Sequence, residues 1–545
     1  MKIAIAQLNY HIGNFEYNTK AIIQSIENAK NLKADLVVFS ELSICGYPAR
    51  DFLEFDDFIE QCENSLKTIA NSCIGIAAIV GSPIKNNAAK GKSLYNAAIL
   101  LENRELKVQT FKTLLPNYDV FDEYRYFEPN TVFEVVNFRN TKIALSICED
   151  LWNVSDDPLY VVNPMDELIS QKPDIMINIA ASPFDYKQNQ KRKDILIKNC
   201  LTYKLPLIYV NHVGAQTELL FDGGSMVINS EGNVFCKLKT FEEDFIIIDT
   251  NDINNKEINF NEKEISKTEN IYNALVMGIK DYFHKMGFSK AILGLSGGID
   301  SAITLVLAVE ALGKDNVKAI LLPSPYSSDH SINDAVLLAE NVGCPYETIS
   351  INNVYNEFLK TLNDQFKNLP FNIAEENLQA RARAVILMAL SNKFGYILLN
   401  TSNKSEAAVG YGTLYGDMCG GLAVLGDVYK TEVYELASFI NSTKEIIPIN
   451  SITKPPSAEL RHEQKDSDSL PDYKILDEIL EQYIEQRKSP SQLIAQGFEK
   501  SLVERIMKLV NTNEYKRYQS PPILRISPKA FGMGRRMPIV GKYLS

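Results

Sequence analysis

Residues 291–301 read Ala-Ile-Leu-Gly-Leu-Ser-Gly-Gly-Ile-Asp-Ser, and the helical pattern Ala-Ile-Thr-Leu-Val-Leu follows them. This order predicts a strand, a glycine turn and the first turn of a helix. Backbone N–H groups at a helix N-terminus are unpaired and carry partial positive charge, so such a turn favours a phosphate group. Gly297 and Gly298 leave room for a ligand beside the backbone, while Ser296 and Ser301 add hydroxyl donors. The turn is not a Walker loop, because its spacing differs and no Lys-Ser or Lys-Thr pair follows the glycines.

Three segments in the first 150 residues carry reactive residue types at or near the ends of predicted strands. Glu41 ends Asp-Leu-Val-Val-Phe-Ser-Glu, Lys112 opens Lys-Thr-Leu-Leu-Pro-Asn-Tyr, and Cys148 ends Ile-Ala-Leu-Ser-Ile-Cys. Singly, each has an ordinary explanation, because acidic and basic residues are mostly solvated and a cysteine after an apolar strand is mostly inert core. Cys45 precedes Gly-Tyr-Pro in a predicted turn and is a second candidate nucleophile.

The segments that must position these residues alternate between short β-branched runs and helical patterns. In residues 1–250 the predicted strands are KIAIAQL, DLVVFSEL, GIAAIVGSP, NAAILL, KIALSICED, DIMINIAA and PLIYVNHVG, with a hairpin turn at 230–233. In residues 271–545 the predicted strands include AILG, VKAILLPSP, PYETISI and GYILLNTSN, with helical patterns between them. The second half therefore predicts a doubly wound, mostly parallel α/β sheet, which binds ligands beyond the carboxyl ends of its strands. We expect residues 251–270, rich in Asn, Lys and Glu, to be a connector and residues 455–473 to be a polar surface loop.

The bulk composition restricts the class of protein. A chain of 545 residues accommodates two to four domains at roughly 100–200 residues each. The net charge of −12 argues against a nucleic-acid-binding protein, and no apolar run approaches the ~20 residues of a membrane helix. The eight cysteines show no C-x-x-C pairing, and none lies near a histidine at zinc-ligand spacing. We expect a cytoplasmic enzyme with free thiols.

Both halves resemble known enzyme families. The segment S-G-G-I-D-S at 296–301 resembles the SGGxDS loop of ATP pyrophosphatases. The segments S-E-L-x-x-x-G-Y-P-x-x-D, K-x-x-L-P-N-Y-x-V-F-D-E-x-R-Y-F and S-I-C-E-D-L-W resemble the three motifs of the nitrilase, or carbon–nitrogen hydrolase, superfamily. That resemblance implies an αββα sandwich and a catalytic Glu-Lys-Cys triad, here Glu41, Lys112 and Cys148. The ammonium of Lys112 is expected to lower the pKa of the thiol and hold the oxyanion, while Glu41 moves protons.

The resemblance also implies supporting and substrate-binding residues in the first half. Glu123 corresponds to a second glutamate that supports the triad, and Tyr118 and Ser182 correspond to glutamine contacts. At the third glutamine contact the family usually has lysine, whereas this chain has Gln188 with Lys187 beside it.

The whole chain, from residue 1 to about 540, resembles the glutamine-dependent NAD synthetase family. The matching segments are E-N-L-Q-A-R-A-R at 376–383, T-S-N-K-S-E at 401–406, G-Y-G-T-L-Y-G-D at 410–417, D-V-Y-K-T at 427–431 and P-S-A-E-L at 456–460. The resemblance implies a nitrilase-type glutamine amidohydrolase domain (1–250) and an NAD synthetase domain (271–545) of the adenine nucleotide alpha hydrolase-like, Rossmann-like type. It assigns ATP binding to Gly294, Leu295, Ser296, Gly297, Gly298, Ile299, Asp300, Ser301, Thr401 and Lys430. It assigns deamido-NAD binding to Asn377, Glu406 and Lys516, and Mg²⁺ binding to Asp300 and Glu406.

The implied reaction is the ATP-dependent amidation of deamido-NAD to NAD. Glutamine hydrolysis would supply ammonia, and an NAD-adenylate would form with release of pyrophosphate and then of AMP. We expect the ammonia to pass through an internal path, because ammonium at neutral pH is mostly protonated and not nucleophilic. The resemblance further implies paired synthetase domains in a homo-oligomer.

Three other functions are compatible with parts of the sequence. A tRNA-modifying ATP pyrophosphatase would share the 296–301 loop, but the acidic balance and the absence of a basic arm argue against it. A nitrilase-type hydrolase with a nucleotide-sensing second half could dispense with Asp300 or Glu406, and both are present. An ammonia-dependent enzyme with an inactive first half would not need Glu41, Lys112 and Cys148.

Overall fold

The computed structural model describes residues 1–154, 158–256, 265–367 and 369–543. The chain forms two compact units, Met1–Glu264 and Ile265–Ser545. Residues 257–264 of the predicted connector lie outside the described residues, and the described parts of that connector are mostly helical. In the described residues, no helix is long and apolar enough to cross a membrane.

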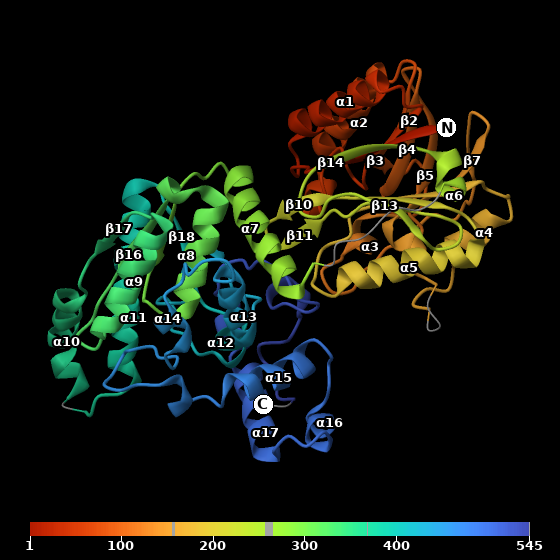
Figure 1. Ribbon diagram of the computed structural model, residues 1–545. Coiled ribbons are helices and arrows are strands. Elements are labelled where there is room, and N and C mark those ends of the chain that lie inside the picture. The colour runs from red at the N-terminus through yellow and green to blue at the C-terminus, as the bar shows by residue number, and fades with distance from the viewer. Residues whose placement is uncertain (155–157, 257–264, 368, 544–545) are drawn as a thin grey trace. The chain divides into compact units, whose positions relative to one another are not determined.

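The N-terminal unit contains two six-stranded sheets and a two-stranded ribbon (Figure 1). Its strands are β1 (Lys2–Gln7), β2 (Leu36–Val38), β3 (Ala77–Lys85), β4 (Leu94–Glu102), β5 (Glu105–Phe111), β6 (Val136–Phe138), β7 (Thr141–Ile147), β8 (Ile175–Ala180), β9 (Leu207–Asn211), β10 (Val213–Gln216), β11 (Leu219–Asp222), β12 (Met226–Ile228), β13 (Val234–Lys237) and β14 (Asp244–Asp249). Its helices are α1 (Phe15–Asn31), α2 (Asp56–Ser72), α3 (Glu123–Tyr126), α4 (Pro164–Ile169), α5 (Gln188–Tyr203) and α6 (Thr250–Asn255). The sheet orders are β14-β1-β2-β3-β4-β5 and β13-β12-β9-β8-β7-β6, and β10 pairs with β11.

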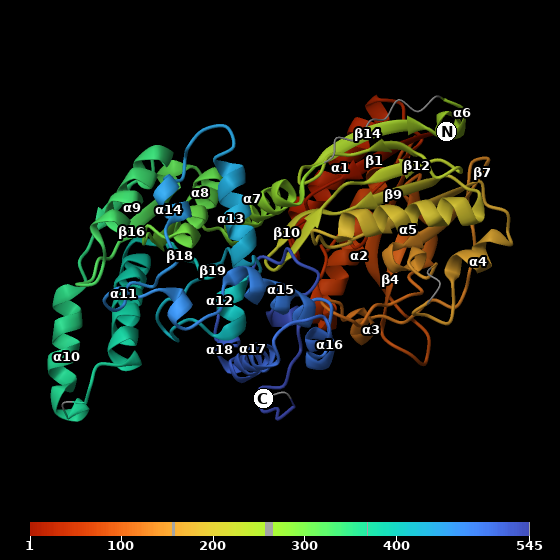
Figure 2. The same cartoon turned by 60° about the horizontal axis from the view of Figure 1, so that its bottom comes forward.

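Alternation along β1 explains how the sheets form layers. Ile3 and Ile5 belong to a core shared with β7, β8 and β9 of the second sheet, whereas Ala4 and Ala6 face a core shared with α1 and α2. Because successive strand residues point to opposite faces, one apolar strand can serve both cores. Helices α1 and α2 cover the outer face of the first sheet, and α4 and α5 cover that of the second (Figure 2). The predicted αββα sandwich is confirmed.

Most of the strands predicted for this unit are present, including the hairpin between β12 and β13. The strand predicted to end near Leu42 is shorter, because β2 ends at Val38. The buried residues that follow form turns, with φ of 46° at Leu42 and 77° at Gly46. An apolar run predicts burial, but it does not distinguish a strand from a buried turn. The predicted end of this strand was therefore wrong.

The C-terminal unit is built on a five-stranded, all-parallel sheet in the order β17-β16-β15-β18-β19. The strands are β15 (Ala291–Gly294), β16 (Val317–Leu321), β17 (Tyr346–Thr348), β18 (Ile397–Asn400) and β19 (Leu422–Ala423). The helices are α7 (Lys267–Met286), α8 (Ile299–Leu312), α9 (Asp329–Val342), α10 (Asn352–Phe366), α11 (Ile373–Phe394), α12 (Lys404–Val409), α13 (Lys430–Ile440), α14 (Ile449–Thr453), α15 (Tyr473–Ile484), α16 (Pro490–Ala495), α17 (Lys500–Thr512) and α18 (Glu514–Arg517). The predicted doubly wound parallel sheet is confirmed.

The strand order places a binding site between β15 and β18. From β15 the chain moves outward to β16 and β17, then returns to the opposite side of β15 as β18. Loops that leave two such neighbouring strands diverge and open a crevice at their carboxyl ends. The 295–298 loop follows β15 and Thr401 follows β18, so the topology brings both predicted nucleotide-binding segments to this crevice.

Candidate active sites

The first site lies in the N-terminal unit and centres on a fully buried ammonium group. Lys112 Nζ donates hydrogen bonds to Glu41 Oε1 at 2.7 Å and to Glu123 Oε1 at 2.8 Å. Lys112 and Glu41 have no exposed side-chain surface, and Glu123 has 5%. A charge this deep is tolerated only with close partners of opposite sign. The structure thus brings together three predicted residues from separate elements: Lys112 directly after β5, Glu41 between β2 and α2, and Glu123 in α3.

Further donors fix the two carboxylates. Asn96 Nδ2 donates to Glu41 Oε1 at 2.7 Å, and the backbone N–H of Ala181 donates to Glu41 Oε2 at 2.9 Å. The Tyr47 hydroxyl donates to Glu123 Oε1 at 2.9 Å. Burial raises the pKa of Glu123 to about 7, against the opposing effect of Lys112. Because both oxygens of Glu41 are engaged, its orientation is set before any substrate arrives.

Cys148 begins a 3₁₀ turn, Cys148–Leu151, directly after β7. Its φ of 42° lies in the left-handed region that L residues seldom adopt. Such strain persists only where the surroundings impose it, and it recurs at functional sites. Asp150 holds the turn, because its carboxylate accepts from the backbone N–H of Ile147 at 3.0 Å, and also from those of Thr113 at 3.0 Å and Leu114 at 2.9 Å. One carboxylate therefore ties the thiol-bearing turn to the two residues after Lys112.

The pKa of the Cys148 thiol is set by opposing influences. Burial raises the pKa of the Cys148 thiol well above its usual range, and the Glu41 carboxylate adds to that effect. Lys112 lowers the pKa, as expected, but burial and the neighbouring carboxylates outweigh it. The expected lowering by Lys112 is therefore present, while burial and the carboxylates, above all Glu41, account for the net rise of the pKa. A thiol with a raised pKa needs a nearby base when it acts as a nucleophile.

The predicted glutamine contacts differ in the partners that hold them. The Tyr118 hydroxyl donates to Glu149 Oε1 at 2.9 Å, directly beside Cys148 in the chain. Ser182 follows Ala181, the donor to Glu41, and its own backbone N–H donates to Asn211 Oδ1 at 2.8 Å. Gln188 is the half-buried first residue of α5, and within the described residues its side chain has no hydrogen bond to the other predicted contacts.

In the C-terminal unit, the loop between β15 and α8 is closed by serine hydroxyls. Ser296 Oγ and Ser301 Oγ lie 3.0 Å apart, and the Gly298 N–H donates to Ser296 Oγ at 3.2 Å. Gly297 has a φ of 78°. The loop leads into the 14-residue helix α8, whose first N–H groups have no intrahelical partner. This is the phosphate-favouring turn that the sequence predicts.

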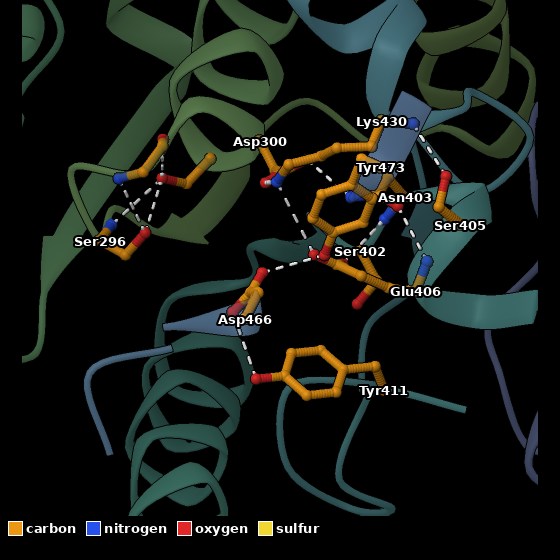
Figure 3. Close-up of polar contacts among 12 residues, drawn as sticks. Ser296, Asp300, Ser402, Asn403, Ser405, Glu406, Tyr411, Lys430, Asp466 and Tyr473 are labelled. Atoms are coloured by element: carbon orange, nitrogen blue, oxygen red, sulfur yellow. Dashed lines mark hydrogen bonds and ion pairs between the residues drawn. The ribbon is translucent and has the colours of Figure 1, made fainter. Parts of the chain in front are cut away.

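Four polar side chains converge beside that loop (Figure 3). Lys430 Nζ lies 2.5 Å from Asp300 Oδ2 and 3.9 Å from Glu406 Oε1, and Asn403 Nδ2 donates to Asp300 Oδ1 at 2.9 Å. Burial raises the pKa of Glu406 to about 8, and the Asp300 carboxylate adds to this. Burial opposes the charge of Lys430, but Asp300 and Glu406 outweigh it and raise the pKa of its ammonium. The structure therefore joins Asp300, Glu406 and Lys430 in one cluster.

These residues face a cavity of about 320 Å³ at the β15–β18 crevice. The predicted residues that line it are Gly294, Leu295, Ser296, Gly298, Ile299, Asp300, Ser301, Thr401, Glu406 and Lys430. Gly297, Asn377 and Lys516 are not part of its lining. Asn377 Oδ1 accepts from Thr413 Oγ1 at 2.7 Å, and Lys516 Nζ donates to Gly410 O at 2.8 Å, so both hold the 410–417 turn.

Comparison with known proteins covers both units. The carbon-nitrogen hydrolase family matches residues 2–254, and the NAD synthase family matches residues 271–520. A glutamine-dependent NAD(+) synthetase from Synechocystis sp. is 46% identical over 548 residues, covering 98% of each chain. The one from Thermotoga maritima is 40% identical over 581 residues, covering 100% of this chain and 99% of its own. This chain belongs to the glutamine-dependent NAD(+) synthetase family.

A solved structure supports the same assignment. Glutamine-dependent NAD(+) synthetase from Acinetobacter baumannii, in complex with ADP, is 39% identical and superposes with a TM-score of 0.79, covering 99% of this chain and 98% of that one.

Two acidic residues of this family member were missed by sequence reasoning. Glu149 is 4% exposed and accepts from Tyr118 at 2.9 Å and from Tyr160 at 3.0 Å. Asp466 is 5% exposed, accepts from Tyr473 at 2.9 Å and lines the C-terminal cavity. The predicted surface loop 455–473 is thus a loop whose middle folds into the site. Its polar composition hid this, since polarity does not separate solvent-facing residues from cavity-facing ones.

Replacing Gly297 with alanine is expected to disrupt the predicted phosphate-binding loop. A Cβ at this position would lie 2.1 Å from the backbone oxygen of Ser331. The left-handed φ adds roughly 1–2 kcal/mol of strain for an L residue. We expect at least a tenfold loss of ATP affinity and a lower melting temperature, measured by titration calorimetry and thermal unfolding. Gly298→Ala is the control for folding, because its Cβ would meet only Ser296 Oγ at 3.3 Å. An unchanged Gly297→Ala protein would contradict this loop geometry.

The raised pKa of Cys148 predicts how the thiol reacts with iodoacetamide. Because the thiolate is the nucleophile, the alkylation rate at Cys148 should rise steadily from pH 7 to pH 9.5 without levelling off. The rate is measured by peptide mass spectrometry, which separates Cys148 from the other seven cysteines. In Glu41→Gln the profile should shift to lower pH, since one negative charge near the thiol is gone. A wild-type plateau below pH 7 would instead indicate a resting thiolate–lysine ion pair.

Proposed function

We propose that this protein converts deamido-NAD to NAD, using ATP for activation and ammonia released from glutamine. The observation that carries the proposal is the presence of two different sites in one chain. One holds a nucleophile among a lysine and two carboxylates, and the other holds a phosphate-binding loop beside a carboxylate–lysine cluster.

In the N-terminal site, Cys148 attacks the carboxamide carbon of glutamine while Glu41 accepts the thiol proton. Lys112 stabilises the oxyanion that forms, and Glu41 returns the proton to the leaving ammonia. Glu41 then takes a proton from water, which hydrolyses the glutamyl thioester to glutamate. Glu123 is a positioning residue, because it accepts a second hydrogen bond from Lys112 Nζ beside that to Glu41.

Charged groups near Cys148 suit the amino-acid end of glutamine. Glu149, held by Tyr118 and Tyr160, would accept the α-ammonium group, since it is a buried carboxylate that forms no ion pair with the residues that the structure describes. Ser182 and Gln188 are the proposed partners of the other end of the substrate. Gln188 is uncharged, so a neutral hydrogen bond replaces the ion pair that a lysine would form at this position.

In the C-terminal site, a carboxylate oxygen of deamido-NAD attacks the α-phosphorus of ATP. The bond to the β-phosphate breaks, and pyrophosphate leaves on the 294–301 loop, with Lys430 and Thr401 as further ATP contacts. Ammonia then adds to the acyl carbon of the NAD-adenylate and AMP departs, which gives NAD. Asn377, Glu406 and Lys516 are the proposed deamido-NAD residues, the first and last acting through the 410–417 turn that they hold.

Asp300 and Glu406 form a donor set that fits Mg²⁺. The ion prefers oxygen ligands and is often held by one or two carboxylates together with substrate phosphates. No group of three or more potential ligands occurs among the described residues, so phosphate oxygens would complete the coordination. Burial and the Asp300 carboxylate raise the pKa of Glu406, and a bound cation would favour its charged form. When bound, Mg²⁺ would offset the repulsion between two polyanionic substrates.

Three further expectations belong to this proposal. Ammonia passes from one site to the other without mixing with solvent, because free ammonium is a poor nucleophile. The active protein is a homo-oligomer of paired synthetase domains, and it works in the cytoplasm.

The adenylate route is tested with deamido-NAD labelled with ¹⁸O in its nicotinate carboxylate. Incubation with ATP, Mg²⁺ and glutamine should give NAD, unlabelled pyrophosphate and AMP that carries one ¹⁸O atom. Label in inorganic phosphate would indicate an acyl phosphate instead. No NAD from folded protein with either glutamine or ammonium would refute the proposed function itself.

A further inference from the structure

The cavity of the C-terminal unit contains three cationic side chains, Arg383, Lys430 and Lys454. Two of them are paired with carboxylates, because Lys430 contacts Asp300 at 2.5 Å and Lys454 contacts Asp334 at 3.3 Å. Arg383 forms no ion pair with any residue that the structure describes. It is therefore the cation of this lining whose charge is still available to a ligand.

One backbone contact fixes the Arg383 guanidinium. Its Nε–H donates to the carbonyl oxygen of Leu322 at 3.0 Å, just beyond the end of β16. This is its single hydrogen bond within the described parts of the chain, so the N–H groups of both terminal nitrogens lack protein acceptors. A guanidinium presents those groups as a planar fork, which matches two oxygens of one phosphate.

Packing places this fork near the phosphate-binding loop. Leu387 lies one helical turn after Arg383 on α11, so the two side chains share a face of the helix. A Cβ at Gly294 would lie 3.3 Å from Leu387 Cδ1 and 3.9 Å from Leu322 Cδ1. Both neighbours of Arg383 thus border the space beside Gly294, and Arg383 and Gly294 line the same cavity.

The surroundings favour an anion at this point. Burial lowers the pKa of Arg383 to about 10, so the side chain remains charged at neutral pH although it has lost much of its hydration. The carboxylates of Asp417 and Glu459 act to raise the pKa of Arg383, but neither forms a hydrogen bond with its guanidinium. A desolvated cation without a close partner gains most from a ligand that brings negative charge.

We propose that Arg383 binds a phosphate group of a nucleotide substrate in the C-terminal cavity. The inference rests on the proposed function, which places two phosphate-bearing substrates there, ATP and deamido-NAD. Arg383 is in this view a binding residue that grips one phosphate with its two terminal nitrogens, while the Leu322 carbonyl holds the guanidinium in place.

Titration calorimetry of the full-length protein with Mg²⁺ tests this proposal. ATP, adenosine and deamido-NAD are titrated separately into wild type, Arg383→Gln and Arg383→Lys. Lys393→Gln is the matched control, because it removes one positive charge from an exposed position on the same helix. We expect Arg383→Gln to bind ATP or deamido-NAD at least tenfold more weakly and adenosine with unchanged affinity. Arg383→Lys should be intermediate, because lysine keeps the charge but not the fork.

The pattern of loss identifies the source of the phosphate. A loss confined to ATP assigns the contact to the triphosphate, and a loss confined to deamido-NAD assigns it to the dinucleotide. Unchanged affinity for both, or an equal loss for adenosine, would overturn the proposal. Thermal unfolding of each variant, followed by circular dichroism, reports whether the C-terminal unit is folded, and Arg383→Lys keeps the test open if Arg383→Gln does not fold. Wild type that binds no nucleotide would refute the proposed function rather than this contact.

Discussion

Replacing Cys148 with alanine is expected to abolish NAD formation from glutamine and to leave NAD formation from ammonium at the wild-type rate. The thiol is the proposed nucleophile, and removing a nucleophile that acts in concert with its base costs roughly four or more orders of magnitude in rate. The C-terminal cavity contains none of the residues of the Cys148 turn. Initial rates with each donor, at saturating ATP and Mg²⁺, measure both effects in one preparation.

Cys45→Ala is the control for this experiment. Cys45 is also buried, and its thiol contacts backbone carbonyls, Gly46 O at 3.5 Å and Leu42 O at 3.9 Å. We therefore expect Cys45→Ala to retain glutamine-dependent activity. Loss of that activity in Cys45→Ala, with normal activity in Cys148→Ala, would reverse the assignment of the nucleophile.

Replacing Asp300 with asparagine is expected to impair the C-terminal site and to spare the N-terminal site. NAD formation should fall at least a thousandfold with both donors, because the change removes a proposed Mg²⁺ ligand and the 2.5 Å partner of Lys430. Glutamine hydrolysis should persist, since its residues lie in the N-terminal unit. NAD is measured with glutamine and with ammonium, and glutamate release is measured separately.

Asp315→Asn provides the matched control, because it makes the same change at an exposed position just after α8. It should have wild-type activity with both donors. An Asp300→Asn protein that still makes NAD from ammonium at more than a tenth of the wild-type rate would remove Asp300 from the proposed chemistry.

Residues close together in sequence were the easiest to predict. The segment 291–301 carries its strand, its glycine turn and its helix start in eleven consecutive residues, and the structure contains all three. Strand and helix periodicity likewise predicted the parallel sheet, because each strand of such a sheet is a short apolar run between helices. Neighbouring residues were therefore sufficient to predict features that form within one short segment of the chain.

Features that depend on distant residues were not predictable in this way. The pKa of Cys148 depends first on its burial and then on Glu41, 107 positions earlier. The motifs placed both residues in one triad, but the burial follows from the packing of two separate sheets. Asp466 contacts Tyr411 at 3.2 Å across 55 positions, so its place in the cavity could not be read from its polar neighbours. The proposed roles of Glu149 and Arg383 likewise rest on burial and partners that only the fold defines.

The contacts of Asp150 have a consequence for protein engineering. Its carboxylate joins the strand end that carries the lysine to the turn that carries the cysteine, so the two reactive groups keep their spacing through one internal anchor. Tyr118 and Tyr160, by contrast, reach the site from segments outside that anchor. Libraries that randomise residues 117–122 and 158–162 could therefore be screened for new amide donors while the hydrolytic chemistry is retained. Asp150 itself is the position that such libraries should leave untouched.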